Sequence, residues 1–151
     1  SIYLNSKFNW MQMFEIRRGL EKSLDVSVYA SLDFGWEQMR KIRTGLEKNL
    51  DVSYYSNHKF NNNQMEQIKD GLSKGLDVSC YAALEYNEKQ MELIKKGLIN
   101  KLDINWYSNP EFNYEQMLEI YLGLQNKLDV SSYANPEIDF IAMKKMRLNL
   151  N

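Results

Sequence analysis

The sequence predicts an all-α fold, an α-solenoid of six tandem repeats that each contain a long helix and a short helix. Three observations predict this fold: a period of 26 residues without insertion or deletion, helix-start motifs at the same position of the repeats, and apolar residues at helical spacing. The 151 residues hold five whole repeats and most of a sixth, so residues 1–151 are expected to form a single repeat domain.

Columns of identical residues carry the period. One column is tyrosine, at Tyr3, Tyr29, Tyr55, Tyr81, Tyr107 and Tyr133, and one is methionine, at Met13, Met39, Met65, Met91, Met117 and Met143. A glycine column holds Gly19, Gly45, Gly71, Gly97 and Gly123, and an aspartate column holds Asp25, Asp51, Asp77, Asp103 and Asp129. A unit of this size cannot bury its apolar face alone, so neighbouring repeats must stack and share a core.

The long helix has a complete start signal. In the first repeat, Asn9 is placed to cap the helix, and Gln12 can reach back to the backbone N–H of the cap, which together make a capping box. Phe8 and Met13 flank the box at the spacing of a hydrophobic staple. The long helix is therefore predicted to begin directly after Asn9.

The body of the long helix is amphipathic. Met13, Ile16, Leu20 and Leu24 recur at offsets that place them on one helical face, which is predicted to be core. The helix is expected to end around Leu24, because the following aspartate is a second capping residue.

A short second helix is predicted after Asp25, with Leu24 and Tyr29 in the staple positions. It cannot run far, because Pro110 and Pro136 stand in the turn that follows in two of the repeats. Each repeat therefore reads as long helix, tight turn, short helix and turn.

The two ends of the chain differ from the repeats between them. Ser1-Ile2-Tyr3 begins inside a motif, which suggests a piece excised from a longer array. In the sixth repeat Ala142 replaces the capping glutamine and Asn149 replaces the glycine, while Ile138-Asp139 replaces Phe-Asn. Because an array must close its core against water, the divergent last repeat is predicted to be a C-terminal cap.

Composition indicates a folded protein that is neither membrane-spanning nor strongly charged. The chain is 44% hydrophobic and 26% charged with a formal net charge of −1, and it contains no long apolar run or signal-peptide pattern. A single cysteine, Cys80, cannot form an internal disulfide, so a cytoplasmic location is the default expectation.

Catalysis is not expected. His58 is the only histidine and occupies a turn, and Cys80 has no base beside it in the sequence, so no nucleophilic site is predicted. The aspartate column recurs once per repeat as a helix cap rather than as converging metal ligands. The chain is therefore predicted to be no enzyme and to hold no cofactor and no metal.

The glycine column needs a separate explanation, because glycine inside a helix costs about 0.5 to 1 kcal/mol relative to alanine. Gly19 lies on the flank of the apolar face, so we expect the column to allow close approach of stacked helices. No glycine-rich run surrounds it, so it does not form a phosphate-binding loop.

Positions that vary between repeats gather on a lateral stripe of the long helix, at Trp10, Phe14, Arg17 and Glu21 of the first repeat and at their equivalents. One position of the short helix varies as well. The predicted binding residues are Trp10, Phe14, Arg17, Trp36, Arg40, Arg43, Tyr54, Lys69, Lys95, Trp106, Tyr114 and Tyr121. Aromatic residues and arginine on a scaffold surface are typical of recognition, so a non-catalytic scaffold that binds a protein or peptide is expected.

Four alternatives stay open, one of which is a small-molecule or catalytic role. The stripe could be partly buried by the next repeat and vary by drift. Its basic row could bind single-stranded nucleic acid with help from the tryptophans, although Tyr121 interrupts the row and the net charge is slightly negative. The basic row is Arg17, Arg43, Lys69, Lys95 and Arg147. The chain could also associate end to end with further copies.

The repeat motif is specific enough to suggest a family. The string that runs from Tyr107 through Asn109-Pro110-Glu111-Phe112-Asn113 to Leu128-Asp129-Val130-Ser131 resembles tandem 26-residue helical repeats in uncharacterised proteins of low-GC Gram-positive gut bacteria and their mobile elements. The resemblance covers the whole chain. It implies a bacterial helical repeat protein and carries no activity or site residues with it.

Overall fold

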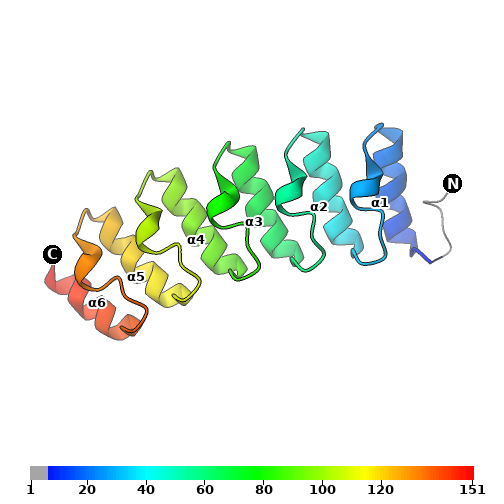
Figure 1. Cartoon of the computed structure of the whole chain (residues 1–151). Helices are drawn as coiled ribbons and strands as arrows, with labels where there is room; N and C mark the ends of the chain where they lie inside the picture. The colour runs from blue at the N-terminus through cyan, green and yellow to red at the C-terminus, as the bar shows by residue number, and fades with distance from the viewer. Residues whose placement is uncertain (1–6) are drawn as a thin grey trace. The chain divides into compact units, whose positions relative to one another are not determined.

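The computed structural model describes residues 7–151, and in this part of the chain long α-helices alternate with single turns of 3-10 helix, without a strand (Figure 1). The long helices are α1 (Trp10–Glu21), α2 (Trp36–Glu47), α3 (Asn62–Ser73), α4 (Glu88–Ile99), α5 (Tyr114–Gln125) and α6 (Phe140–Asn149). The 3-10 helices are η1 (Val26–Val28), η2 (Val52–Tyr54), η3 (Val78–Cys80), η4 (Ile104–Trp106) and η5 (Val130–Ser132). The predicted all-α solenoid is confirmed.

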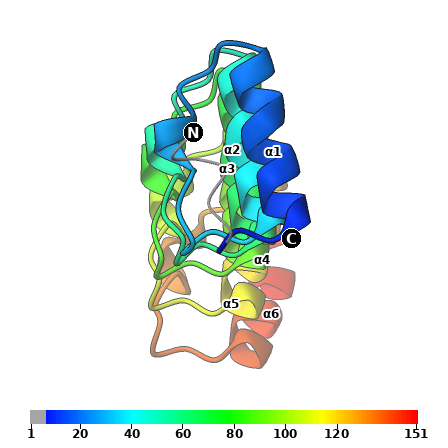
Figure 2. The ribbon, with the colours of Figure 1, turned by 90° about the vertical axis from the view of Figure 1, so that its right-hand side faces the viewer.

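The chain divides into two compact units, one that ends at Val78 and one that begins at Ser79. In the first unit α1 packs against α2 and α2 against α3, and in the second unit α4 packs against α5 and α5 against α6. Within each unit the long helices form one layer and the 3-10 helices form a second layer beside it (Figure 2). The motif Ser1-Ile2-Tyr3 lies outside the described residues.

The predicted capping boxes are confirmed. The side chains of Asn9, Asn61, Asn87 and Asn113 each accept a hydrogen bond from the backbone N–H of the glutamine three residues later, and that glutamine accepts one from the backbone N–H of the asparagine. In α2 the cap is Gly35, whose N–H still donates to Gln38 Oε1 at 2.8 Å. In α6, Asp139 caps through the N–H of Ala142.

The long helix ends earlier than predicted. In the first repeat its last residue is Glu21, and Ser23 then takes a left-handed conformation with φ of 57°. The N–H of Leu24 donates back to the carbonyl of Gly19 at 3.0 Å and the N–H of Ser23 donates to the carbonyl of Leu20 at 3.0 Å, which is a Schellman motif. Apolar spacing predicted a longer helix because Leu24, which lies beyond the helix end, continues the spacing of Ile16 and Leu20.

The short helix is a single 3-10 turn, and its predicted aspartate cap is confirmed. Asp25 accepts a hydrogen bond from the N–H of Ser27 at 3.1 Å, and Asp51, Asp103 and Asp129 make the equivalent bond in their own repeats. These carboxylates therefore have a local task at the start of each turn.

The core differs in one respect from the predicted apolar face. Ile16, Met39 and Ile42 are fully buried, as expected, but Leu20 is exposed. The fully buried tyrosine column contributes Tyr29, Tyr55, Tyr81, Tyr107 and Tyr133 to this core. The core therefore lies between the long helix and the 3-10 layer, where the tyrosines stand, and Leu20 is at its edge.

The glycine column leaves room for the tyrosines of the same repeats. The expectation that it allows close approach of stacked helices is therefore wrong. A Cβ on Gly45 would overlap the hydroxyl of Tyr55 in the same repeat and would lie 2.9 Å from Val52 Cγ1. The Tyr55 hydroxyl donates to the carbonyl of Lys41 in the long helix at 3.1 Å. Gly19, Gly97 and Gly123 face the tyrosine of their own repeats in the same way. Glycine is therefore required where the 3-10 layer docks on its own long helix.

The buried tyrosines predict a loss of stability at alkaline pH. Burial raises the pKa of Tyr29 and of Tyr133 from 10.0 to about 12, whereas an unfolded tyrosine ionises near its ordinary value of about 10. Because the pKa of these tyrosines is higher in the folded protein than in the unfolded chain, their contribution to the free energy of unfolding is complete below pH 10. It is lost as the pH rises toward 12. We expect the urea midpoint to fall between pH 9 and pH 11.5. A urea midpoint that does not change over that range would contradict the burial of these tyrosine hydroxyls in the core.

Candidate functional site

Part of the variable stripe lies inside the contact between neighbouring long helices. Glu15 of α1 is fully buried. Its carboxylate accepts a hydrogen bond from Arg43 Nε of α2 at 2.7 Å and another from Arg40 Nε at 2.9 Å. Arg43 is only 6% exposed, so this is a buried ion pair that joins the first two repeats.

Further charges extend the ion pair into a cluster. Arg43 also pairs with Glu47 of its own helix, and Lys22 Nζ lies 2.9 Å from Glu47 Oε2. Burial alone lowers the pKa of Arg43, but the hydrogen bond and charge of Glu15 outweigh it and raise the pKa above its ordinary value. Arg43 therefore keeps its positive charge in the buried contact.

Other repeats use different pairs at the same positions. Between α2 and α3 the order of charges is reversed, since Lys41 of α2 pairs with Glu66 of α3. In the same contact Lys69 Nζ donates to Thr44 Oγ1 at 2.6 Å, and burial lowers the pKa of Lys69. In this contact Lys41 of α2 thus stands at the repeat position that Glu15 occupies in α1.

In the second unit, one contact between neighbouring long helices is ionic and the other is uncharged. Between α5 and α6, Arg147 Nε lies 2.7 Å from Glu119 Oε2, and both side chains are buried. In α4 and α5 the positions of Glu15 and Arg43 are occupied by Leu93 and Tyr121, which are buried as well. Tyr121 accepts a hydrogen bond at 2.9 Å from Nδ2 of Asn100, the residue directly after α4. Residues at these positions are therefore matched across each of these contacts.

The predicted basic row is not an exposed row. Arg43, Lys95 and Arg147 are buried, and Lys69 is partly buried and bonded to Thr44. The expectation that Arg43, Lys95 and Tyr121 lie on an exposed stripe is therefore wrong. Only Arg17 is exposed among the members of this column in the described residues. The physical reason is that Arg43, Lys69 and Arg147 face the preceding long helix of their own unit.

An exposed part of the stripe remains at the amino-terminal halves of α1 and α2. Trp10 is 70% exposed and Phe14 is 47% exposed. With neighbouring side chains they line an almost wholly apolar cleft of about 250 Å³ between the two helices. We call this cavity the aromatic cleft. Its lining residues are Trp10, Met11, Phe14, Glu15, Trp36 and Arg40.

Cations hold the aromatic side chains of this cleft. The guanidinium of Arg40 lies 4.8 Å from the centroid of the Trp36 ring while its Nε bonds to Glu15. The guanidinium of Arg18 lies 5.9 Å from the centroid of the Phe14 ring. Contacts of this kind stabilise an aromatic face and leave its edge available.

The remaining predicted binding residues lie apart from the aromatic cleft. Tyr54 and Trp106 are exposed, but they stand in η2 and η4, in the other layer of their units. Tyr114 is half-buried on α5, where Lys89 Nζ lies 5.8 Å from its ring centroid. The twelve predicted residues therefore do not form one surface.

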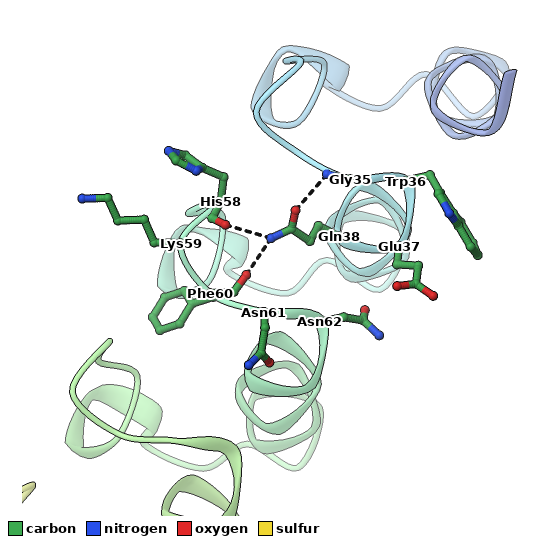
Figure 3. Close-up of a pocket in the computed structure, with 9 residues that line it drawn as sticks. All are labelled: Gly35, Trp36, Glu37, Gln38, His58, Lys59, Phe60, Asn61 and Asn62. Carbon is green, nitrogen blue, oxygen red and sulfur yellow. Dashed lines mark hydrogen bonds between the residues drawn. The ribbon is translucent and has the colours of Figure 1, made fainter. Parts of the chain in front are cut away.

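A larger cavity of about 490 Å³ lies between the start of α2 and the turn before α3 (Figure 3). At its centre Gln38 Nε2 donates to the carbonyl of His58 at 2.9 Å and to the carbonyl of Phe60 at 2.6 Å. Figure 3 shows the Gln38 amide between Gly35 and this turn, with its polar atoms all engaged. We assign this cavity a structural role.

Gln38 belongs to a glutamine column whose second function the sequence analysis missed. Gln12 Nε2 donates to the carbonyl of Phe34 at 2.8 Å, and Gln90 Nε2 to the carbonyl of Phe112 at 2.7 Å. Gln12, Gln38 and Gln90 thus each cap their own helix and also bind the turn of the next repeat. The signal was available, because the second repeat keeps Gln38 although its cap is Gly35.

No other chemical site is found in the described residues. Histidine, cysteine, aspartate and glutamate side chains do not gather in residues 7–151 in a group that could hold a metal ion. In the same range, no helix has the length and apolar character needed to cross a membrane.

Fold and site define a class, an α-solenoid of short two-helix repeats with an aromatic cleft between two of its long helices. Comparison of the chain with protein-family models, curated proteins and solved structures gives no significant match.

Proposed function

We propose that this protein is a non-catalytic scaffold that recognises another protein or a peptide through the aromatic cleft. The observation that carries the proposal is the exposure of Trp10 and Phe14 beside Trp36 in one apolar concavity. Large aromatic residues dominate binding energy at protein interfaces, where they fill or line pockets that exclude water. An exposed cluster of this kind is costly on a surface without a partner.

Binding of single-stranded nucleic acid is the weaker candidate. It depended on a continuous row of exposed cations, but Arg43 and Arg147 serve buried glutamates instead. A strand held by charge and stacking needs cations that can reach its phosphates.

The source and the cellular location of the protein are proposed from the sequence alone. A bacterial cytoplasmic location fits the resemblance of the repeats and the single cysteine, Cys80, which requires no disulfide.

Removal of the two tryptophans tests the function. We expect a Trp10→Ala, Trp36→Ala variant to keep its helical circular dichroism but to lose affinity for peptides that the unaltered protein selects from a random display library. Truncation of a central aromatic residue costs about 2 kcal/mol or more, so the loss should exceed roughly thirtyfold.

Trp106→Ala is the matched control, since Trp106 is exposed in the other layer of its unit. It should bind the selected peptides as the unaltered protein does. Equal binding by the double variant, or loss only with Trp106→Ala, would refute the cleft as the recognition surface.

A further inference from the structure

The charges around the aromatic cleft indicate what kind of peptide it accepts. We propose that the cleft binds an acidic peptide segment that inserts one large apolar side chain between α1 and α2, an inference that rests on the function proposed above. The argument uses the charge balance of the cleft floor, the charges on its rim and its size.

The floor of the cleft contributes no free negative charge. Glu15 lines the cleft, but it is fully buried and both its carboxylate oxygens accept hydrogen bonds from Arg40 and Arg43. Together with Glu47 and Lys22 this cluster contains three cations and two anions. Arg40 lines the cleft together with Glu15, and its side chain is 51% exposed. Because Arg40 is half-exposed and Glu15 is fully buried, the charge that this pair exposes to a ligand is positive.

The rim has the same sign. Arg18 stands beside Phe14, and Arg17 is exposed on the same turn of α1. The first turn of α1 has no acidic residue. Glu37 is the acidic residue in the first turn of α2, but it lines the neighbouring cavity rather than the aromatic cleft. An approaching acidic segment therefore meets arginines on both helices.

The size of the cleft selects the apolar part of the ligand. Sites for small molecules and cofactors enclose about 300 to 1,000 Å³. The aromatic cleft, at about 250 Å³, is smaller, and four of its six lining residues are aromatic or apolar. It therefore suits one inserted leucine, phenylalanine or tryptophan side chain, while charge complementarity governs the flanking residues.

The test uses three fluorescein-labelled peptides and one oligonucleotide. The first is a short peptide with a central tryptophan between alternating glutamates and serines. The second carries lysine in place of each glutamate, and the third carries serine in place of the tryptophan. An oligothymidine of similar length is the fourth probe. Affinity is measured by fluorescence anisotropy with the full chain at low and at physiological salt.

We expect the acidic tryptophan peptide to bind at least tenfold more tightly than the lysine peptide and the serine peptide, with a preference that shrinks as salt rises. Arg40→Gln should reduce the preference for acid severalfold. Lys48→Gln is the matched control, because Lys48 is an exposed cation at the opposite end of α2, and it should leave the preference intact.

Each other outcome overturns the inference in a recognisable way. Equal binding of the acidic and the lysine peptide, with dependence on the central tryptophan, would remove the acidic preference and leave the proposed function standing. Tighter binding of the oligothymidine would assign the cleft to nucleic acid. If no peptide binds, the acidic ligand is refuted, and the library selection described above decides separately whether the cleft binds peptides at all.

Discussion

Gly45→Ala is expected to lower the free energy of unfolding by about 3 kcal/mol, although alanine is the better helix former by about 1 kcal/mol. The added Cβ would overlap the hydroxyl of Tyr55 and press against Val52. The tyrosine must then move, and it loses its partly buried hydrogen bond to the carbonyl of Lys41. Urea unfolding followed by circular dichroism measures the change.

Two further variants separate this mechanism from a general effect of substitution. Tyr55→Phe in the Gly45→Ala background removes the overlapping oxygen, so it should recover part of the loss, limited by the ring carbon Cζ at 3.2 Å. Gly35→Ala is the control, since its Cβ would meet only Gln38 Oε1 at 3.7 Å. A Gly45→Ala protein as stable as the Gly35→Ala protein would contradict the account of the glycine column.

Glu15→Leu is the second large effect, with an expected cost of about 3 kcal/mol. The change leaves the buried guanidinium of Arg43 with Glu47 as its remaining partner, and a buried charge that loses a partner is strongly destabilising. Because α1 and α2 form this contact, the loss should appear as faster hydrogen exchange in α1 and α2.

The chain itself supplies the rescue. In α4 and α5, leucine, leucine and tyrosine occupy the positions of Glu15, Arg40 and Arg43, at Leu93, Leu118 and Tyr121. A triple variant, Glu15→Leu with Arg40→Leu and Arg43→Tyr, should therefore recover most of the lost stability, because a well-packed apolar contact can replace an ion pair. If the triple variant is less stable than Glu15→Leu alone, the contacts are not matched sets.

Local structure was predictable from the sequence because its causes are local. Asn9 and Gln12 form the capping box that their spacing predicts, and Asp25 caps the 3-10 turn. The end of the long helix was placed too late, because no fixed residue marks it: the left-handed position is Ser23 in one repeat and Gly75 in another. The left-handed residue sets the end of the helix, and the spacing of apolar residues does not reveal its position.

The binding stripe was only partly predictable, because a helical wheel gives the angle of a side chain but not what lies opposite. Arg40 and Arg43 look similar on the wheel, yet one is half-exposed and the other is buried against Glu15. A usable signal was present in the pairing across repeats. Glu15 with Arg43, and Glu119 with Arg147, are opposite charges at the same separation of 28 residues.

The purpose of the glycine column was not predictable from its own repeat position. Its nearest contacts are Tyr55 and Val52, which follow the long helix and return onto it through the 3-10 turn. The expected stacking partner was instead the neighbouring helix, because sequence alone does not reveal which of two packed elements approaches the glycine.

The indole N–H signals of the three tryptophans provide the most direct test of the central claim, that the aromatic cleft is the binding surface. In a ¹⁵N-labelled chain titrated with the unlabelled acidic peptide, we predict that the signals of Trp10 and Trp36 shift together and saturate. The signal of Trp106, in η4, should stay in place. Shifts of Trp106 with stationary Trp10 and Trp36 signals would contradict the claim and move the binding surface to the 3-10 layer.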